Sequence, residues 1–220
     1  MTTLTSPPLS NLLTQLFEDA KTSSAVLAQM STNTPPEERT RLMTSKTEYR
    51  EMYSRMKEFH LAVSPATGTL LYMLARNSKA RSIVEFGTSF GISTLHLAAA
   101  LRDNGGGRVI STEFETSKIA RARANIEAAG LGDLVEIRAG DALQTLSGDL
   151  PRTIDLVLLD GAKSLYPQVL ALLEPQLRPG AMIVADNADW SPEYLSRVRT
   201  VANGYLSVPF GDDVEVSLKL

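Results

Sequence analysis

The spacing of apolar residues changes near residue 81 of the 220-residue chain. Before that point apolar side chains recur with a helical period, and after it short apolar runs alternate with helical patterns. The first helical stripe is formed by Leu9, Leu12, Leu13, Leu16 and Phe17. We therefore expect one domain over residues 1–220, with a helical N-terminal extension over 1–80 and an α/β core over 81–220.

The helical extension shows several helix signals. A second short helix is expected around Val26–Met30, and Thr34-Pro-Pro-Glu37 has the threonine cap, early prolines and later glutamate of a helix start. The helix that follows carries one stripe of Tyr49, Met52, Tyr53, Met56 and Phe59. We interpret this stripe as core or as a homodimer surface, because Met and Tyr suit adaptable contacts; a lid over a bound acceptor is the alternative.

The α/β core begins with an apolar run and then alternates regularly. Strands are expected at Ser82–Phe86, Arg108–Thr112, Val135–Arg138, Ile154–Leu159 and Met182–Ala185, with helices between them. Such alternation predicts a parallel sheet with helices on both faces. Two further strand-like runs, Gly204–Val208 and Val214–Lys219, are joined by the loop Pro209–Asp213, which is short enough for an antiparallel hairpin. The expected sheet therefore has seven strands and is mostly parallel.

Composition narrows the classes of partner. The net charge of −3 disfavours a nucleic-acid partner. The absence of cysteine excludes disulfides and thiolate metal sites, and two histidines cannot build a multi-histidine zinc site. Any metal would have oxygen ligands, which favours Mg²⁺, Ca²⁺ or Mn²⁺. The N-terminal residues show no signal-peptide pattern, and no apolar run approaches the ~20 residues that span a bilayer. We expect a cytoplasmic protein without a membrane partner.

The first candidate binding loop follows the first strand of the core. It reads Glu85-Phe-Gly87-Thr-Ser89-Phe-Gly91, and a helical pattern begins directly after it. Ligands of open α/β sheets bind at such carboxyl ends of strands. The loop lacks the G-x-G-x-x-G spacing of dinucleotide sites, and Glu85 would repel a pyrophosphate but suit a cationic ligand. The alternative is that both glycines only permit a strand-to-helix turn.

Acidic residues also follow the next two strands. Glu113 could accept hydrogen bonds from both hydroxyls of a ribose; the alternative is that Glu113 or Glu115 caps the next helix. Asp141, at the end of the third strand, could hold a ring amino group such as that of adenine. Its alternative role is that of a helix N-cap.

The fourth and fifth strands end in a second constellation. Asp160, Asp186 and Asn187 would meet at one edge of the sheet as oxygen ligands of an octahedral divalent cation. Lys163 follows closely, and desolvation near a metal would lower its pKa and make it a general base. The alternatives are a helix cap at Asp160, a turn at Asp186-Asn187 and a solvated lysine.

Together these segments resemble the cation-dependent O-methyltransferase family, which includes catechol and caffeoyl-CoA O-methyltransferases and many small bacterial relatives. The segments are Glu85–Gly91, Ser111–Glu113, Gly140–Ala142, Asp160–Tyr166, Leu177–Gly180 and Ala185–Asn187. The resemblance implies a Rossmann-like class I methyltransferase fold and S-adenosyl-L-methionine as cofactor. It also implies Mg²⁺, or another divalent cation such as Mn²⁺ or Ca²⁺, and a small catechol-like acceptor.

The resemblance also implies roles for particular residues. The amino-acid and sulfonium portion of the cofactor would be surrounded by Val63, Glu85, Gly87, Ser89 and Ser93. Glu113 would hold the ribose, and Asp141 and Ala142 would lie beside the adenine. The metal ligands would be Asp160, Asp186 and Asn187, with Asp160 also beside the cofactor and Lys163 as the catalytic lysine.

Three departures from the family pattern concern the acceptor. Ala162 stands where many relatives have an acid, Gly161 stands where mammalian catechol enzymes have a histidine, and the stretch after Asn187 is short. Acceptor recognition would then fall to the N-terminal helices, to Trp190 and Tyr194, or to the loop Pro209–Asp213.

Three other functions remain open at this point. They are a metal-independent O- or N-methyltransferase, a nicotinamide oxidoreductase and a non-catalytic cofactor-binding protein. The missing G-x-G-x-x-G pattern and Glu85 argue against the oxidoreductase. His96 lies in the middle of a predicted helix, and we interpret it as a packed residue.

Overall fold

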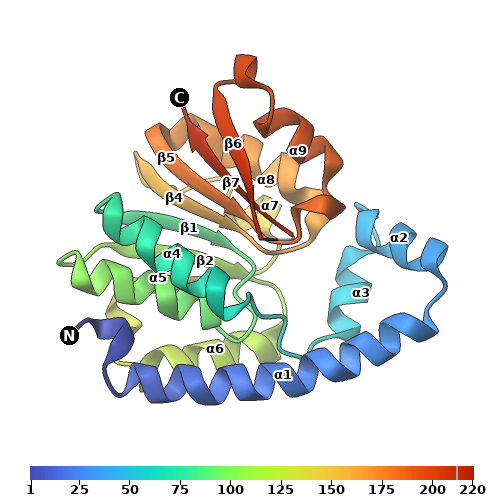
Figure 1. Cartoon of the computed structure of the whole chain (residues 1–220), viewed down its shortest axis with the longest axis horizontal. Helices are drawn as coiled ribbons and strands as arrows, with labels where there is room; N and C mark the ends of the chain where they lie inside the picture. Colours follow the sequence, from blue (N-terminus) through green and yellow to red (C-terminus); the bar gives the residue numbers. More distant parts are fainter. Residues whose placement is uncertain (212) are drawn as a thin grey trace.

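The computed structural model describes residues 1–211 and 213–220, without the side chains of Met30 and Ser31. Its strands are β1 (Ser82–Phe86), β2 (Arg108–Glu113), β3 (Val135–Ala139), β4 (Ile154–Leu159), β5 (Leu177–Ala185), β6 (Tyr205–Phe210) and β7 (Val214–Lys219). They form one sheet of seven strands in the order β3-β2-β1-β4-β5-β7-β6 (Figure 1). The first five strands are parallel, and β7 runs antiparallel to both of its neighbours. The predicted Rossmann-like sheet with an antiparallel C-terminal hairpin is confirmed.

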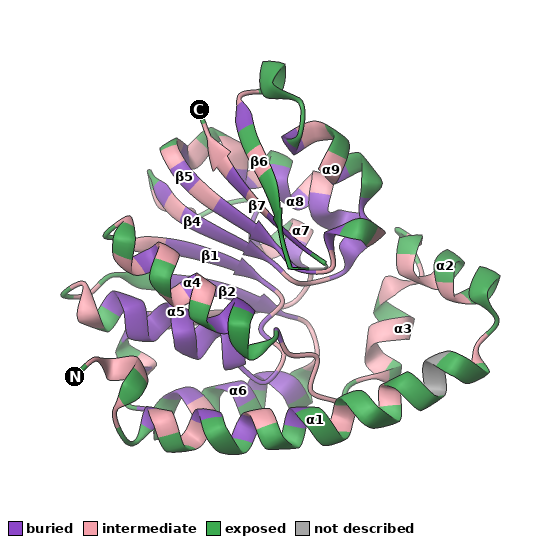
Figure 2. Cartoon of the chain, viewed as in Figure 1, coloured by how far each residue is buried: buried purple, intermediate pink, exposed green. Residues whose placement is uncertain are grey.

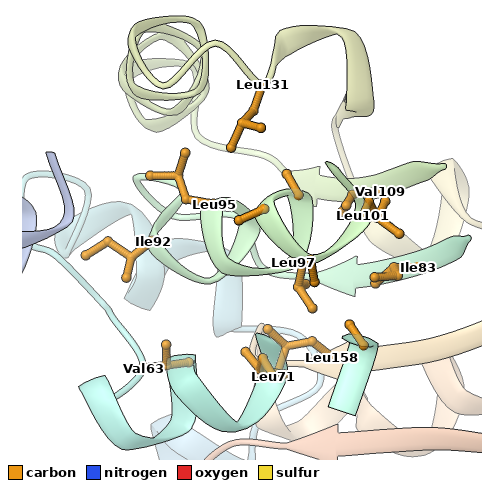
Figure 3. Packing of buried hydrophobic residues seen from close by; sticks show 14 of the residues in the cluster. Val63, Leu71, Ile83, Ile92, Leu95, Leu97, Leu101, Val109, Leu131 and Leu158 are labelled. Atoms are coloured by element: carbon orange, nitrogen blue, oxygen red, sulfur yellow. The ribbon is translucent and has the colours of Figure 1, made fainter. Parts of the chain in front are cut away.

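Helices cover both faces of this sheet. They are α1 (Leu9–Asn33), α2 (Pro36–Thr44), α3 (Tyr49–Arg55), α4 (Pro65–Asn77), α5 (Ile92–Asp103), α6 (Thr116–Ala128), α7 (Ala142–Thr145), α8 (Tyr166–Leu173) and α9 (Pro192–Val198). One buried cluster joins α1, α4, α5 and α6 to the sheet, and a second joins α7, α8 and α9 to its other face. Figure 3 shows the first cluster, in which Leu71 of α4 and Leu97 of α5 lie near Ile83 of β1.

The strands in the middle of the sheet are apolar because both faces are covered. In β4, five of six residues are buried, and in β1 Ile83–Phe86 are buried without a break. Alternating strands would expose one face to water, whereas continuous apolar runs require two covered faces. The strand ends that follow these runs are thus held by a rigid, packed layer.

The contact between α4 and α5 confirms the packed role of His96. This side chain is 3% exposed, and its Nδ1 lies 2.8 Å from the carbonyl oxygen of Ile92. A Cβ atom on Gly68 of α4 would lie 2.8 Å from the imidazole ring. The two helices therefore approach closely at a glycine, and His96 fills the space.

The N-terminal helices differ from their predicted bounds. α1 continues from Leu9 to Asn33 as one helix, so the prediction of two separate helices is wrong. No Gly or Pro interrupts this stretch, and the polar residues between the two apolar groups continue the helix. The N-cap of α2 is Pro35 rather than Thr34. The side chain of Met30, part of the predicted second helix, lies outside the described residues.

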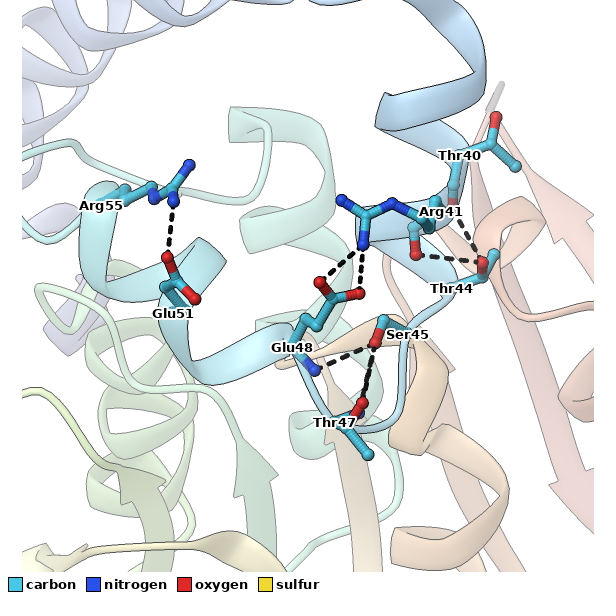
Figure 4. A network of polar contacts seen from close by, with 8 residues as sticks. All are labelled: Thr40, Arg41, Thr44, Ser45, Thr47, Glu48, Glu51 and Arg55. Atoms are coloured by element: carbon cyan, nitrogen blue, oxygen red, sulfur yellow. Dashed lines mark hydrogen bonds and ion pairs between the residues drawn. The ribbon is translucent and has the colours of Figure 1, made fainter.

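The helix predicted to carry the Tyr–Met stripe is broken into α2 and α3. Ser45 Oγ accepts a hydrogen bond of 3.0 Å from the backbone N–H of Glu48, which stabilises the turn between the two helices. Arg41 of α2 forms an ion pair with the carboxylate of the same Glu48 (Figure 4). α3 then ends at Arg55, so Phe59 lies outside it.

α2 and α3 together form a flap, by which we mean residues 36–55. Neither helix contains a buried residue, in contrast to the strands (Figure 2). Polar contacts attach the flap to the core: Ser164 Oγ donates to the carbonyl oxygen of Ser45 at 2.9 Å, and Lys46 pairs with Glu193 at 3.1 Å. The exposed Lys46–Glu193 pair contributes little stability, and with no buried residue in its two helices the flap is more easily displaced than the core.

The C-terminal strands pair as expected, with Val208 opposite Val216. In the predicted loop Pro209–Asp213, residues 209 and 210 belong to β6, and Asp212 lies outside the described residues. In the part of the chain that the structure describes, no helix combines the length and the apolar character needed to cross a bilayer.

Candidate active site

The loop after β1 makes the strand-to-helix turn that its glycines predicted. Gly87 has φ +104°, and a Cβ atom there would lie 2.6 Å from the backbone oxygen of Asp160. Gly91 has φ +89° and is the N-cap of α5. The backbone of β1 and the end of β4 therefore approach each other at a point where only glycine fits.

Glu85 lies beneath this loop in the packed interior. Its side chain is fully buried and accepts hydrogen bonds from the hydroxyls of Ser93, Thr94 and Ser111. Burial raises the pKa of Glu85 to about 7, although the three hydroxyls oppose the shift. The structure therefore places Glu85 behind the cavity wall, and its predicted contact with a cofactor stays a prediction.

A narrow cavity of about 60 Å³ opens at the carboxyl ends of β1, β2 and β3. Most of the residues predicted to hold the cofactor line it: Gly87, Ser89, Glu113, Asp141, Ala142 and Asp160. Ser93 instead lines a smaller adjoining cavity together with Ser89, and Val63 lies in the wall of the wider cleft described below. The structure thus brings the strand-end acids together, as the sheet topology required.

Glu113 is fixed by backbone amides. Its Oε2 accepts from the N–H of Ser89 at 2.9 Å, and its Oε1 accepts from Phe114 and Glu115 at 2.9 and 3.0 Å. Burial raises the pKa of Glu113 against these bonds. Glu115 is the N-cap residue of α6, but its side chain makes no capping hydrogen bond. The structure therefore does not show the alternative in which the Glu115 side chain caps this helix.

Asp141 takes the predicted N-cap role, and its predicted contact with a ring amino group stays a prediction. It caps α7 by accepting 2.9 Å from the N–H of Leu143, and it also lines the cavity. From the flap, Arg50 forms an ion pair with its carboxylate, and the Tyr49 hydroxyl donates to it at 3.1 Å. Burial alone would raise the pKa of Asp141, but the amide and Arg50 hold it below its usual value.

A wide cleft of about 640 Å³ lies on the other side of Asp160. Lys163, Asp186 and Asn187 line its polar end, so the predicted second constellation is assembled. Lys163 is 5% exposed, and its Nζ lies 2.6 Å from Asp160 Oδ1. The alternative of a solvated lysine is therefore wrong.

The charge state of Lys163 depends on its carboxylate partner. Burial acts to lower the pKa of Lys163, but the negative charge of Asp160 outweighs it and raises the pKa well above its usual value. The predicted lowering beside a bound metal stays a prediction, because it requires a positive charge next to the lysine.

Asp186 and Asn187 complete the polar end. Burial, followed by the charge of Asp160, raises the pKa of Asp186 to about 8. Asn187 has φ +48°, and its Nδ2 donates to Asp213 Oδ2 at 2.7 Å. This bond uses the amide nitrogen, so the amide oxygen stays the atom with which Asn187 can bind a cation.

The residues of this end fit a hard divalent cation. Two carboxylates and an amide oxygen are the ligand types that such cations prefer. Burial and the neighbouring charge of Asp160 both disfavour the ionised form of Asp186, and a bound cation would stabilise that form. No three His, Cys, Asp or Glu side chains among residues 1–211 and 213–220 are placed to hold a metal, so a cation would need Asn187.

Among the other wall residues, Arg50 and Lys118 carry no sequence signal that would have revealed them, whereas Tyr49 and Tyr53 belong to the predicted Tyr–Met stripe. Tyr49 and Arg50 reach the narrow cavity from the flap, and Lys118 reaches it from α6 with its Nζ 5.4 Å from the Phe90 ring centroid. Tyr53 lines both the cavity and the cleft, and Met56 lines the cleft. Tyr49 and Tyr53 also pack against the second buried cluster, so this part of the Tyr–Met stripe contacts both the site and the core.

Of the three sources proposed for acceptor recognition, the N-terminal helices and the loop Pro209–Asp213 contribute residues to the cleft, whereas Tyr194 does not. Residues of α1, α2 and α3 line the cleft, and so does Asp213. Tyr194 is fully buried beside Tyr166, with ring centroids 5.7 Å apart, and therefore packs in the core.

Comparison with known proteins agrees with this architecture. Residues 84–188 match the family described as "Methyltransferase domain". A catechol O-methyltransferase of Niastella koreensis is 38% identical over 130 residues, which cover 58% of this chain and 58% of that protein. A catechol O-methyltransferase of Mycobacterium tuberculosis is 36% identical over 127 residues, 58% of this chain and 57% of that protein. The chain therefore spans less than two thirds of the length of both relatives.

Solved structures extend the likeness over more of the chain. The O-methyltransferase TomG of Streptomyces achromogenes, in complex with SAM, has a TM-score of 0.62 and 28% identity and covers 75% of this chain and 85% of its own. An O-methyltransferase of Bacillus cereus in complex with SAH has a TM-score of 0.63 and 26% identity, covering 78% and 89%. The predicted resemblance to the small bacterial O-methyltransferases is confirmed, and residues 84–188 are similar to a methyltransferase domain.

Proposed function

We propose that the chain is an S-adenosylmethionine-dependent O-methyltransferase that methylates a hydroxyl of a catechol-like acceptor with the help of a divalent cation such as Mg²⁺. The catechol O-methyltransferase names of two relatives and the SAM and SAH complexes of two structural neighbours support the proposal. We also propose a cytoplasmic homodimer that binds a small-molecule acceptor.

One observation carries the proposal: Asp160 lines both the narrow cavity and the wide cleft. Group transfer requires two reactants to meet with their reacting atoms in contact. A donor in the cavity at the ends of β1–β3 and an acceptor in the cleft would meet beside this residue. A protein that only binds a cofactor has no need of the second, polar-ended cleft.

The residues of the polar end have separable tasks. A divalent cation held by Asp160, Asp186 and Asn187 would acidify the acceptor hydroxyl and fix its position. Lys163 holds Asp160 in place at 2.6 Å. A cation bound to Asp160 would offset the negative charge that raises the pKa of Lys163, so that the amine would then take the proton of the acceptor hydroxyl. Burial excludes water from this amine, which limits competing proton exchange.

The test combines binding and turnover. Calorimetry with S-adenosylmethionine should show binding, and methyl transfer to a panel of catechols should be abolished by EDTA and restored by Mg²⁺. Asp160→Ala should lose metal-dependent turnover and still bind S-adenosylmethionine. Asp189→Ala, at an exposed aspartate of the same region, is the matched control and should retain both.

Absence of cofactor binding at millimolar concentration would refute the whole proposal. Turnover that is insensitive to EDTA would instead favour the metal-independent O- or N-methyltransferase that the sequence left open. Loss of cofactor binding in Asp160→Ala would mean that this aspartate belongs to the cofactor site alone.

A further inference from the structure

We infer that the acceptor is amphiphilic: a hydroxylated aromatic head carried on an uncharged apolar body that extends well beyond one ring. This inference rests on the proposed function and names the class of acceptor for the same site. It follows from the size, the polarity and the charge of the wide cleft.

The size of the cleft exceeds the needs of a small catechol. Its volume of about 640 Å³ lies within the range of roughly 300–1,000 Å³ that is typical of sites for drug-sized ligands. The polar end, with Asp160, Lys163, Asp186 and Asn187, accommodates the reacting hydroxyl. Most of the cleft therefore remains for the rest of the acceptor.

The cleft is polar at one end, and apolar side chains predominate along the rest of its walls, where Lys21, Ser24, His60 and Ser64 also lie. α1 contributes Phe17, Ala20 and Leu27, which lie three and seven residues apart and so share one face of the helix. α2 adds Met43, and Met56 lies just after α3. Apolar side chains around an open cleft are stabilised when an apolar ligand removes them from water.

The part of this wall at Leu27 exists because α1 is one continuous helix. Its first half packs on the core through Leu9, Leu13, Leu16 and Ala20. Beyond Ala20 none of its described side chains is buried, yet the helix continues to Asn33 and reaches the flap (Figure 1). The second half of α1 therefore lines a ligand space instead of a protein core.

The charges of the cleft exclude a strongly anionic body. Lys163 is paired with Asp160, and the exposed Lys21 is paired with Glu18 at 2.5 Å. His60 lies in the wall, and burial lowers its pKa, so it is neutral at physiological pH. These described lining residues leave no cluster of unpaired cations for the phosphates of a coenzyme A ester.

A homologous acceptor series tests the inference. Catechols with a 4-alkyl chain from methyl to octyl share the reacting head and differ only in the apolar body. With saturating S-adenosylmethionine and Mg²⁺, kcat/KM should rise roughly three-fold per methylene over the first several carbons, as expected for burial of a methylene group. Caffeoyl-CoA should be a poorer acceptor than 4-octylcatechol.

Two adjacent variants locate the effect in the cleft. Leu27→Trp places a larger side chain in the apolar wall and should lower the octyl-to-methyl ratio of kcat/KM by at least about ten-fold. Val26→Trp is the matched control, because Val26 is 42% exposed and lies outside the cleft wall. It should preserve the ratio of the wild type.

The outcomes separate the inference from the function on which it rests. Turnover of 4-methylcatechol with a flat or falling series, or better turnover of caffeoyl-CoA, would overturn the inference alone. An equal change of the ratio in both tryptophan variants would also overturn it. No methyl transfer to any catechol would refute the proposed function and the inference together.

Discussion

Replacement of Glu85 by Gln should change how the stability of the protein depends on pH. The carboxyl group is fully buried between β1, β2 and α5 and accepts three hydroxyl hydrogen bonds. Glutamine has nearly the same shape, and the hydroxyls of Ser93, Thr94 and Ser111 can reorient to accept from its amide. The variant therefore removes the titration while it keeps the packing.

The magnitude follows from the shifted pKa. Burial raises the pKa of Glu85 from 4.5 to about 7, which corresponds to roughly 3 kcal/mol of cost for the ionised form. Because the folded pKa lies above the unfolded one, the stabilising contribution is present below pH ~4.5 and is lost as the pH rises through ~7. The stability of the wild type minus that of Glu85→Gln should fall by about 2–3 kcal/mol between pH 5 and pH 8.

Urea denaturation at several pH values between 5 and 8 measures this difference directly. In thermal melts the same change corresponds to a relative shift of about 5–10 °C for a chain of this size. Glu37→Gln, at an exposed glutamate in the first turn of α2, is the control and should follow the wild type. Parallel pH profiles for the wild type and Glu85→Gln would refute the reasoning, since they would show that this carboxyl does not titrate in the window.

Two further substitutions test the positioning of the site. Asp213→Ala should weaken the binding of Mn²⁺ by about ten-fold or more, because Asp213 holds the side-chain amide of Asn187. The binding of S-adenosylmethionine should not be lost. The fluorescence of the single tryptophan, Trp190, can report the binding of Mn²⁺. Unchanged affinity for Mn²⁺ would show that the side chain of Asn187 does not need Asp213 to hold its orientation. Gly87→Ala should destabilise the fold by about 2 kcal/mol or more and weaken cofactor binding, since its Cβ would lie 2.6 Å from a backbone oxygen. Gly148→Ala, with open space around it, should do neither.

The core of the fold was predictable because its signals are local. The apolar runs Ser82–Phe86, Ile154–Leu159 and Val214–Lys219 have the bounds that the sequence predicts. Parallel pairing of the first five strands then places their carboxyl ends at one edge, whatever the details of packing. For the same reason Asp160, Asp186 and Asn187 could be assembled from sequence alone.

The N-terminal part was less predictable because its structure depends on tertiary contacts. The continuity of α1 requires only that nothing breaks it, whereas the apolar groups had indicated two helices. The break at Ser45 is stabilised by the hydrogen bond that its side-chain oxygen accepts from the backbone N–H of Glu48. The period of the apolar residues does not reveal such a bond. The contacts of Tyr49 and Arg50 with Asp141 join residues about 90 positions apart. The apolar wall of the cleft therefore became visible only with the fold.

The acids at the strand ends show that a structural hydrogen-bonding role does not preclude a place in the cavity wall. Asp141 caps α7 and also faces the cavity, while Glu113 binds the amides of Ser89, Phe114 and Glu115 and also faces it. An ionised carboxylate has about four lone-pair sites, so amide bonds leave room for a ligand hydroxyl. These bonds fix the carboxylates before a ligand arrives, which reduces the ordering cost of binding. A capping role for an acid at a strand end is thus a reason to expect a better binding site there, not a reason against one.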